Sequence, residues 1–70
     1  MPNHITIWIN GELAQTAANQ SVSALLDSLK VAPERVAVEL NKSIVRKRDW
    51  DATLIAGGSH IEVVEFVGGG

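Results

Sequence analysis

Apolar and polar residues alternate over residues 4–10, near the start of the chain. The three isoleucines of this segment fall on one side and the other residues on the opposite side, which is the spacing of a half-buried β-strand. Asn10-Gly11 follows, a dipeptide that suits the positive φ angles of a two-residue hairpin turn. The pattern therefore predicts a hairpin whose second strand covers residues 13–17, with the isoleucines facing the core.

A helical spacing of apolar residues follows Ser21. Ser21 is a good N-cap residue, and Pro33 with the two residues before it marks the end of the segment. The apolar residues recur at the i, i+3, i+4, i+7 positions of one helix face, namely Val22, Leu25, Leu26 and Leu29. We expect a short amphipathic helix that buries this whole stripe, Leu29 included, against the isoleucine face of the hairpin.

The second half of the chain contains further strand patterns. Alternation predicts a strand over residues 35–40, a polar turn leads to a short strand at residues 44–45, and a turn at residues 57–59 precedes a last strand at residues 60–66. Trp50 stands alone in a polar stretch, where we expect it to cover the edge of the core. The order of two strands, a helix and three strands predicts an α+β fold with the helix on one face of a single sheet.

Length and composition limit the possible functions. Seventy residues with 46% hydrophobic and 20% charged residues are typical of one folded domain, here residues 1–70. The absence of cysteine excludes disulfides, thiolate-held clusters and cysteine nucleophiles in this chain. A formal net charge of −2 argues against nucleic-acid binding. No signal peptide or membrane-spanning apolar run is present in the sequence, so we expect a cytoplasmic protein with no membrane partner.

The chain ends in Val67-Gly68-Gly69-Gly70. One interpretation is a frayed end, because terminal residues are often disordered and glycine packs against nothing. The other is a flexible tail, residues 67–70, that enters the active site of another protein, where missing Cβ atoms allow close approach. Four extended residues reach about 13 Å, so such a tail would be long enough to enter a partner.

Several segments, taken in order, resemble the ThiS family of sulfur carriers over nearly the whole chain. They are residues 7–12 (IWINGE), 22–26 (VSALL), 36–41 (VAVELN), 44–45 (IV), Trp50, 61–64 (IEVV) and 66–70 (FVGGG). The chain differs from the usual family pattern at Arg46-Lys47, where Pro-Arg is common, and at Gly58-Ser59, where Gly-Asp is common. Both differences fall in predicted loops, so we expect them to affect partner choice and not the fold.

The resemblance implies a ubiquitin-like β-grasp fold, with a mixed five-stranded sheet and one main helix on one face. It also implies that a ThiF-type enzyme uses ATP and magnesium to adenylate the carboxylate of Gly70. A persulfide donor then converts the adenylate to a thiocarboxylate, which delivers sulfur to the thiazole synthase ThiG. A carrier of this kind binds no cofactor or metal of its own and needs no catalytic residue, so we expect it not to be an enzyme.

Partner-binding residues are predicted on the sheet and in the tail. If the first and last strands are neighbours, Trp8, Val64 and Phe66 form an apolar patch on the sheet face away from the core, beside the tail residues Val67, Gly68 and Gly69. The alternative is that Trp8 packs locally over a strand edge and that a bulge turns Phe66 into the core.

Other candidate functions and sites also follow from the sequence. A MoaD-like carrier for molybdopterin would use the same terminal chemistry, and a ubiquitin-like modifier or interaction module would use the tail differently or not at all. His4 and His60 have no third ligand at metal spacing, so we expect them to be exposed strand-end residues. The basic run at residues 46–48 is either a solvated loop or a docking site for an acidic partner.

Overall fold

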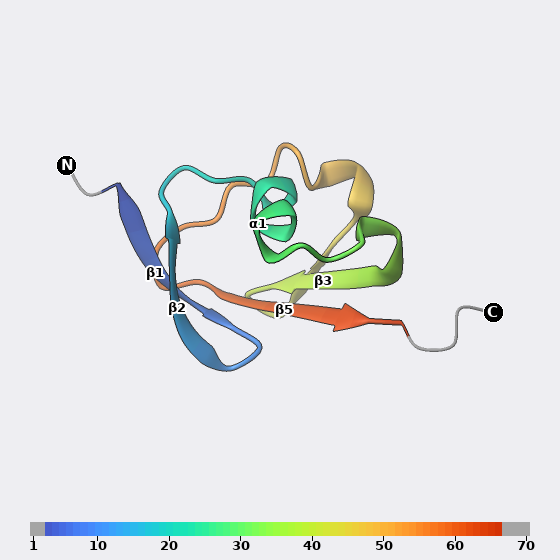
Figure 1. The fold of residues 1–70 in the computed structure, drawn as a ribbon, viewed down its shortest axis with the longest axis horizontal. Helices are drawn as coiled ribbons and strands as arrows, with labels where there is room; N and C mark the ends of the chain where they lie inside the picture. The colour runs from blue at the N-terminus through green and yellow to red at the C-terminus, as the bar shows by residue number, and fades with distance from the viewer. Residues whose placement is uncertain (1–2, 67–70) are drawn as a thin grey trace.

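The computed structural model describes residues 3–66 of the chain, which form one sheet with one α-helix on one face (Figure 1). The strand order is β2-β1-β5-β3-β4. β1 and β5 run parallel, and all other neighbours in the sheet are antiparallel. The elements are β1 (His4–Ile9), β2 (Glu12–Ala17), α1 (Val22–Leu29), the 3₁₀ turn η1 (Pro33–Arg35), β3 (Val36–Leu40), β4 (Ser43–Val45), the 3₁₀ turn η2 (Lys47–Asp49) and β5 (His60–Glu65). The predicted α+β fold is confirmed.

Two hairpins with two-residue turns build most of the sheet. Asn10 and Gly11 join β1 to β2 with φ angles of 50° and 83°. Asn41 and Lys42 join β3 to β4 with φ angles of 52° and 71°. Positive φ at both central residues is the geometry that matches the right-handed twist of the flanking strands. The first turn has the predicted glycine, whereas the second places a lysine in the left-handed region.

The helix α1 begins and ends with well-defined caps. The Ser21 hydroxyl accepts a hydrogen bond from the Ala24 N–H at 3.1 Å, as the sequence predicts. At the other end Lys30 adopts a φ of 60°, and the N–H of Val31 donates to the carbonyl of Leu26 at 3.4 Å. These contacts close a Schellman-type cap. No helix in the described part of the chain is long and apolar enough to cross a membrane.

One residue of the predicted helical stripe is not buried. Leu29 is 39% exposed, whereas Val22, Leu25 and Leu26 are at most 2% exposed. The prediction that the whole stripe is buried is therefore wrong at Leu29. Because the chain leaves the helix through the left-handed cap directly after Leu29, Val31 packs against the core beyond the last turn instead.

The core lies between α1 and the inner face of the sheet. Its buried members are Ile7, Val22, Leu25, Leu26, Val36, Val38, Trp50, Ile55 and Ile61. Trp50 is more deeply placed than the sequence predicts, because it is 4% exposed and belongs to the core itself. Its indole Nε1–H donates to the carbonyl of Val45 at 2.9 Å. This bond satisfies the only polar atom of the ring, so the loop after β4 can bury the tryptophan.

Candidate functional site

β5 lies at the centre of the sheet and leads directly into the glycine-rich end of the chain (Figure 1). The predicted reactive residue Gly70 and the predicted tail residues Val67, Gly68 and Gly69 lie outside the described residues. The described part of the candidate site therefore consists of β5, Phe66 and the strands that hold them.

Two turn asparagines hold β5 from opposite sides. The side-chain amide of Asn10 forms two bonds to Val63, in which Oδ1 accepts from the Val63 N–H at 2.8 Å and Nδ2 donates to the Val63 carbonyl at 3.2 Å. Across the strand, Asn41 Oδ1 accepts from the His60 N–H at 2.8 Å. Each side-chain amide forms hydrogen bonds to β5 that a backbone peptide group would form if β1 or β3 continued. The strand that leads to the tail is therefore fixed at its start and at its middle.

The sheet face opposite α1, which we call the outer face, carries an aromatic stack at one end. Trp8 and His60 are direct register partners on β1 and β5. Their rings are stacked with centroids 4.6 Å apart and an interplanar angle of 3°. Trp8 is half-buried as a result. The predicted placement of Trp8 on this face is correct. Its local packing is against His60 of the neighbouring strand and not over a strand edge.

Val64 and Phe66 extend the apolar surface of the outer face toward the end of β5. They are 55% and 56% exposed. The alternative that a bulge turns Phe66 into the core is therefore wrong. Instead, the N–H of Phe66 donates to the carbonyl of Arg35 at 2.7 Å, which keeps the residue in line with the strand.

Two exposed apolar residues of the outer face are absent from the sequence-based prediction. Leu13 is paired with Trp8 and is 63% exposed. Ile44 is paired with Glu39 and is 76% exposed. Both positions follow from the two-residue turns, because a turn of that length fixes which residues of a hairpin lie opposite each other. The outer face thus carries five large apolar side chains, namely Trp8, Leu13, Ile44, Val64 and Phe66.

The centre of the outer face is acidic. Glu39 on β3 and Glu62 on β5 are direct register partners. Like charges directly opposite each other destabilise a sheet. Among the described residues, the only ion pair within 4.0 Å joins Arg48 to Asp49, so neither glutamate has a neutralising partner at that distance. A basic group from another protein would relieve this repulsion.

The histidines and the basic run do not form a site with one another. His60 belongs to the aromatic stack, while His4 lies four residues away from Trp8 along β1, a distance of about 13 Å. No cluster of three or more metal-ligating side chains occurs within residues 3–66. Arg46, Lys47 and Arg48 are exposed at η2.

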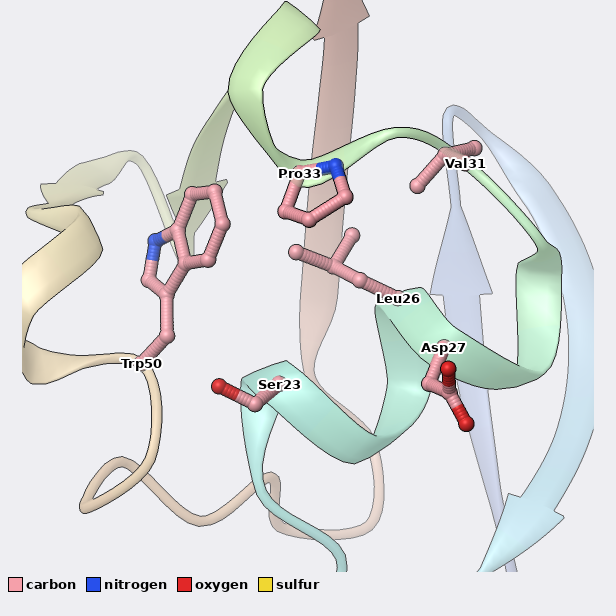
Figure 2. Close-up of a pocket in the computed structure, with 6 residues that line it drawn as sticks. All are labelled: Ser23, Leu26, Asp27, Val31, Pro33 and Trp50. Carbon is pink, nitrogen blue, oxygen red and sulfur yellow. The ribbon is translucent and has the colours of Figure 1, made fainter.

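A small hollow lies on the helix side of the sheet (Figure 2). Four apolar residues and two polar ones line a volume of about 150 Å³, namely Leu26, Val31, Pro33, Trp50, Ser23 and Asp27. Pockets for cofactors and small molecules usually measure roughly 300–1,000 Å³. This hollow is too small for such a ligand, and it lies on the side of the sheet away from the outer face.

Comparison with known proteins agrees with the fold. The ThiS family model matches residues 7–70. The crystal structure of the thiamine biosynthesis protein ThiS from Geobacter metallireducens superposes with a TM-score of 0.83 at 36% identity, covering 94% of this chain and 100% of that one. The sheet and helix therefore form the β-grasp fold of ThiS proteins.

Two curated relatives differ greatly in length. The sulfur carrier protein ThiS of Escherichia coli is 30% identical over 64 residues, which cover 91% of this chain and 97% of that protein. A thiazole synthase of Magnetococcus marinus is 42% identical over 64 residues, covering 91% of this chain. The chain spans about a fifth of the length of the thiazole synthases that it matches. From the family match, the shared fold and the full-length relative, the chain belongs to the ThiS family of sulfur carrier proteins.

Proposed function

We propose that this chain carries sulfur for thiazole formation in thiamine biosynthesis and that the carboxylate of Gly70 is its reactive group. The observation that supports this most strongly is the family match, which runs through the last glycine. The similarity to the sulfur carrier protein ThiS of E. coli, over 91% of this chain, also supports it. The chain itself then acts as a protein substrate and not as an enzyme.

The proposed chemistry begins with activation of the carboxylate. A carboxylate is a poor electrophile because its charge repels nucleophiles and because its oxygen is a poor leaving group. A ThiF-type enzyme would transfer AMP from magnesium-bound ATP to Gly70 and release pyrophosphate. The terminal sulfur of a persulfide donor then displaces AMP and forms an acyl disulfide. A thiol attacks the donor's sulfur, so that the sulfur–sulfur bond breaks and the thiocarboxylate is released.

The thiocarboxylate would then pass to thiazole synthase. The similarity to thiazole synthases over the length of this chain supports that partner. Glycines at the three last positions allow a narrow passage, since no Cβ atom widens the tail. The outer face is the proposed docking surface, with Val64 and Phe66 next to the start of this segment and Trp8 at the opposite end of β5.

Intact-protein mass spectrometry tests the carrier role. The chain would be incubated with ATP, magnesium, a ThiF-type enzyme and a persulfide source, beside a variant that lacks Gly70. We expect the full chain to gain the mass difference between sulfur and oxygen and the shortened variant to stay unchanged. No gain by the full chain, with an enzyme that is active on another ThiS protein, would contradict the proposal.

A matched pair of variants tests the docking surface. Val64→Asp places a charge among the apolar residues of the outer face, whereas Leu54→Asp places one at a 60% exposed leucine that lies outside β1 to β5. We expect only the first variant to slow thiocarboxylate formation while both remain folded. Equal rates for the two variants would remove Val64 from the docking surface.

Partner capture separates the alternatives that share the tail chemistry. Co-purification with thiazole synthase supports the thiamine pathway, and co-purification with a molybdopterin-synthase large subunit supports a MoaD-like role. Isopeptide conjugates to cellular lysines would instead support a ubiquitin-like modifier.

A further inference from the structure

The two sides of β5 are paired over different lengths. On the β3 side, the N–H of Asn41 donates to the carbonyl of His60 and the N–H of Phe66 donates to the carbonyl of Arg35, both at 2.7 Å. Backbone N–H and C=O groups of successive strand residues point to alternate sides. Residues 60, 62, 64 and 66 therefore turn their backbone groups toward β3, and this pairing extends to the last described residue.

On the β1 side, the pairing stops earlier. Here the N–H groups of Trp8 and Asn10 donate to the carbonyls of Ser59 and Ile61, both at 2.9 Å. Asn10 then uses its side chain to bond both backbone groups of Val63. Glu65 is the next residue that faces this side, and β1 has already turned into the hairpin. Within residues 3–66, no strand lies beside the backbone N–H and C=O of Glu65.

We infer that this short open edge at Glu65 receives an extended segment of thiazole synthase, which adds to the sheet as a strand beside the end of β5. The inference rests on the proposed function, which makes thiazole synthase the sulfur acceptor. An open strand edge is a template for pairing with another chain. Val64 and Phe66 precede and follow Glu65 in the chain and are both more than half exposed. Their side chains lie on the outer face, where the side chains of an added strand would cover them.

Charge favours a different protein over a second copy of this chain as the occupant. Glu65 is the residue of β5 at the open edge. Two copies paired antiparallel along this edge would bring their two Glu65 carboxylates close together, which costs free energy. An incoming strand with lysine or arginine would be attracted instead. Since four residues follow Phe66, a strand at Glu65 would also enter beside the segment that must reach the acceptor's active site.

The two variants Glu65→Pro and Glu65→Ala isolate the backbone donor. Both remove the carboxylate, but only proline also removes the N–H that the added strand would use. Proline is tolerated where the N–H has no partner in the sheet, so both variants should fold. We expect Glu65→Pro to bind purified thiazole synthase about tenfold more weakly than Glu65→Ala, as loss of one interface hydrogen bond and a steric conflict predict. Equal affinities would overturn the inference.

Amide hydrogen exchange of the wild-type chain gives a second measurement that does not depend on the fold of a variant. We expect the Glu65 amide to exchange rapidly in the free chain and to become protected in the complex, while the Val64 amide is protected in both. A Glu65 amide that stays unprotected in the complex, or that is protected in the free chain through dimerisation, would overturn the inference. Absence of a complex would overturn it as well, whereas the mass measurement decides the carrier role separately.

Discussion

The β1–β2 and β3–β4 hairpins flank β5 and share a design, but they support the strand differently. Both have two-residue turns that begin with an asparagine at a φ of about 50°. In both, the asparagine side chain bonds to the backbone of β5. The β3 hairpin holds β5 from its first residue to Phe66, whereas the β1 hairpin ends its support at Val63.

In the proposed complex with thiazole synthase, this difference would have a functional consequence. A strand that is fixed on both sides along its whole length has no backbone left for another protein. By stopping at Val63, the β1 hairpin leaves the end of β5 anchored by β3 and open on its other side. The sheet can therefore stay folded while its last residues take part in an interface.

The strongest test of this difference compares proline at two successive positions of β5. Val64 directs its N–H toward β3, so Val64→Pro removes a bond within the sheet and should lower the free energy of unfolding by about 3 kcal/mol. Glu65→Pro should change it by less than about 1 kcal/mol relative to Glu65→Ala. Chemical denaturation of the variants measures both values. If the two prolines cost the same, the assignment of sides along β5 is wrong.

The side chains of the two turn asparagines should differ in how much they contribute to stability. Asn10 makes two side-chain bonds to Val63 and Asn41 makes one to His60. At roughly 0.5–1.5 kcal/mol for each bond, we expect Asn10→Ala to cost about 2 kcal/mol and Asn41→Ala about 1 kcal/mol. Both variants lose the same preference for positive φ, so each is the control for the other. Asn10→Asp keeps the acceptor but loses the donor, and its stability should fall between wild type and Asn10→Ala.

Much of this architecture can be predicted from the sequence. Alternation and the Asn10-Gly11 turn predict the first hairpin, and Ser21 with the apolar spacing predicts α1, because these signals are local. The exposure of Leu29 cannot be predicted in the same way. It depends on a cap that places Lys30, a residue without glycine's freedom, at a φ of 60°. The depth of Trp50 also depends on how the loop after β4 folds back, so that the Val45 carbonyl, five residues earlier, accepts its N–H.

The candidate site also combines features with a local sequence signal and features that depend on the fold. The glycine-rich end is visible in the sequence, and the exposed positions of Val64 and Phe66 follow from alternation once β1 and β5 are neighbours. The bond of Asn10 to a residue 53 positions later has no local signal. It arises only when the register of β5 against β1 is fixed, and so does the open edge at Glu65.

The aromatic stack provides a smaller test at the start of β5. Stacked aromatic pairs contribute about 0.5–1.5 kcal/mol beyond the area that they bury, so His60→Ala should lower stability by about 1 kcal/mol. It should also expose Trp8 and shift its fluorescence emission to longer wavelength. Trp50 also emits, but it is 4% exposed, and the variant Trp50→Phe isolates the signal of Trp8. An unchanged spectrum in the Trp50→Phe background would show that His60 does not cover Trp8 in solution.

The smallest expected effect comes from exchanging the second residues of the two turns. Gly11 has a φ of 83°, and a Cβ atom placed there has no neighbour within 4 Å. Gly11→Lys should therefore lower the free energy of unfolding only because a lysine is strained in the left-handed conformation. Lys42 has a φ of 71°, and Lys42→Gly should raise the free energy of unfolding by relieving the same strain. Left-handed conformation costs a non-glycine residue roughly 1–2 kcal/mol, partly offset by the entropy that glycine loses. We therefore expect changes of about 0.5–1 kcal/mol with opposite signs.

The double exchange sharpens the comparison of the two hairpins. Because the turns lie on opposite sides of β5 and share no contact, the two effects should add and nearly cancel. A double variant that is clearly less stable than wild type would mean that Gly11 does more than relieve backbone strain. Since Gly11 follows Asn10 directly, the cause would then be a disturbed bond between Asn10 and Val63. Amide exchange at Val63 would identify this cause, because the Asn10 side chain is what protects that amide.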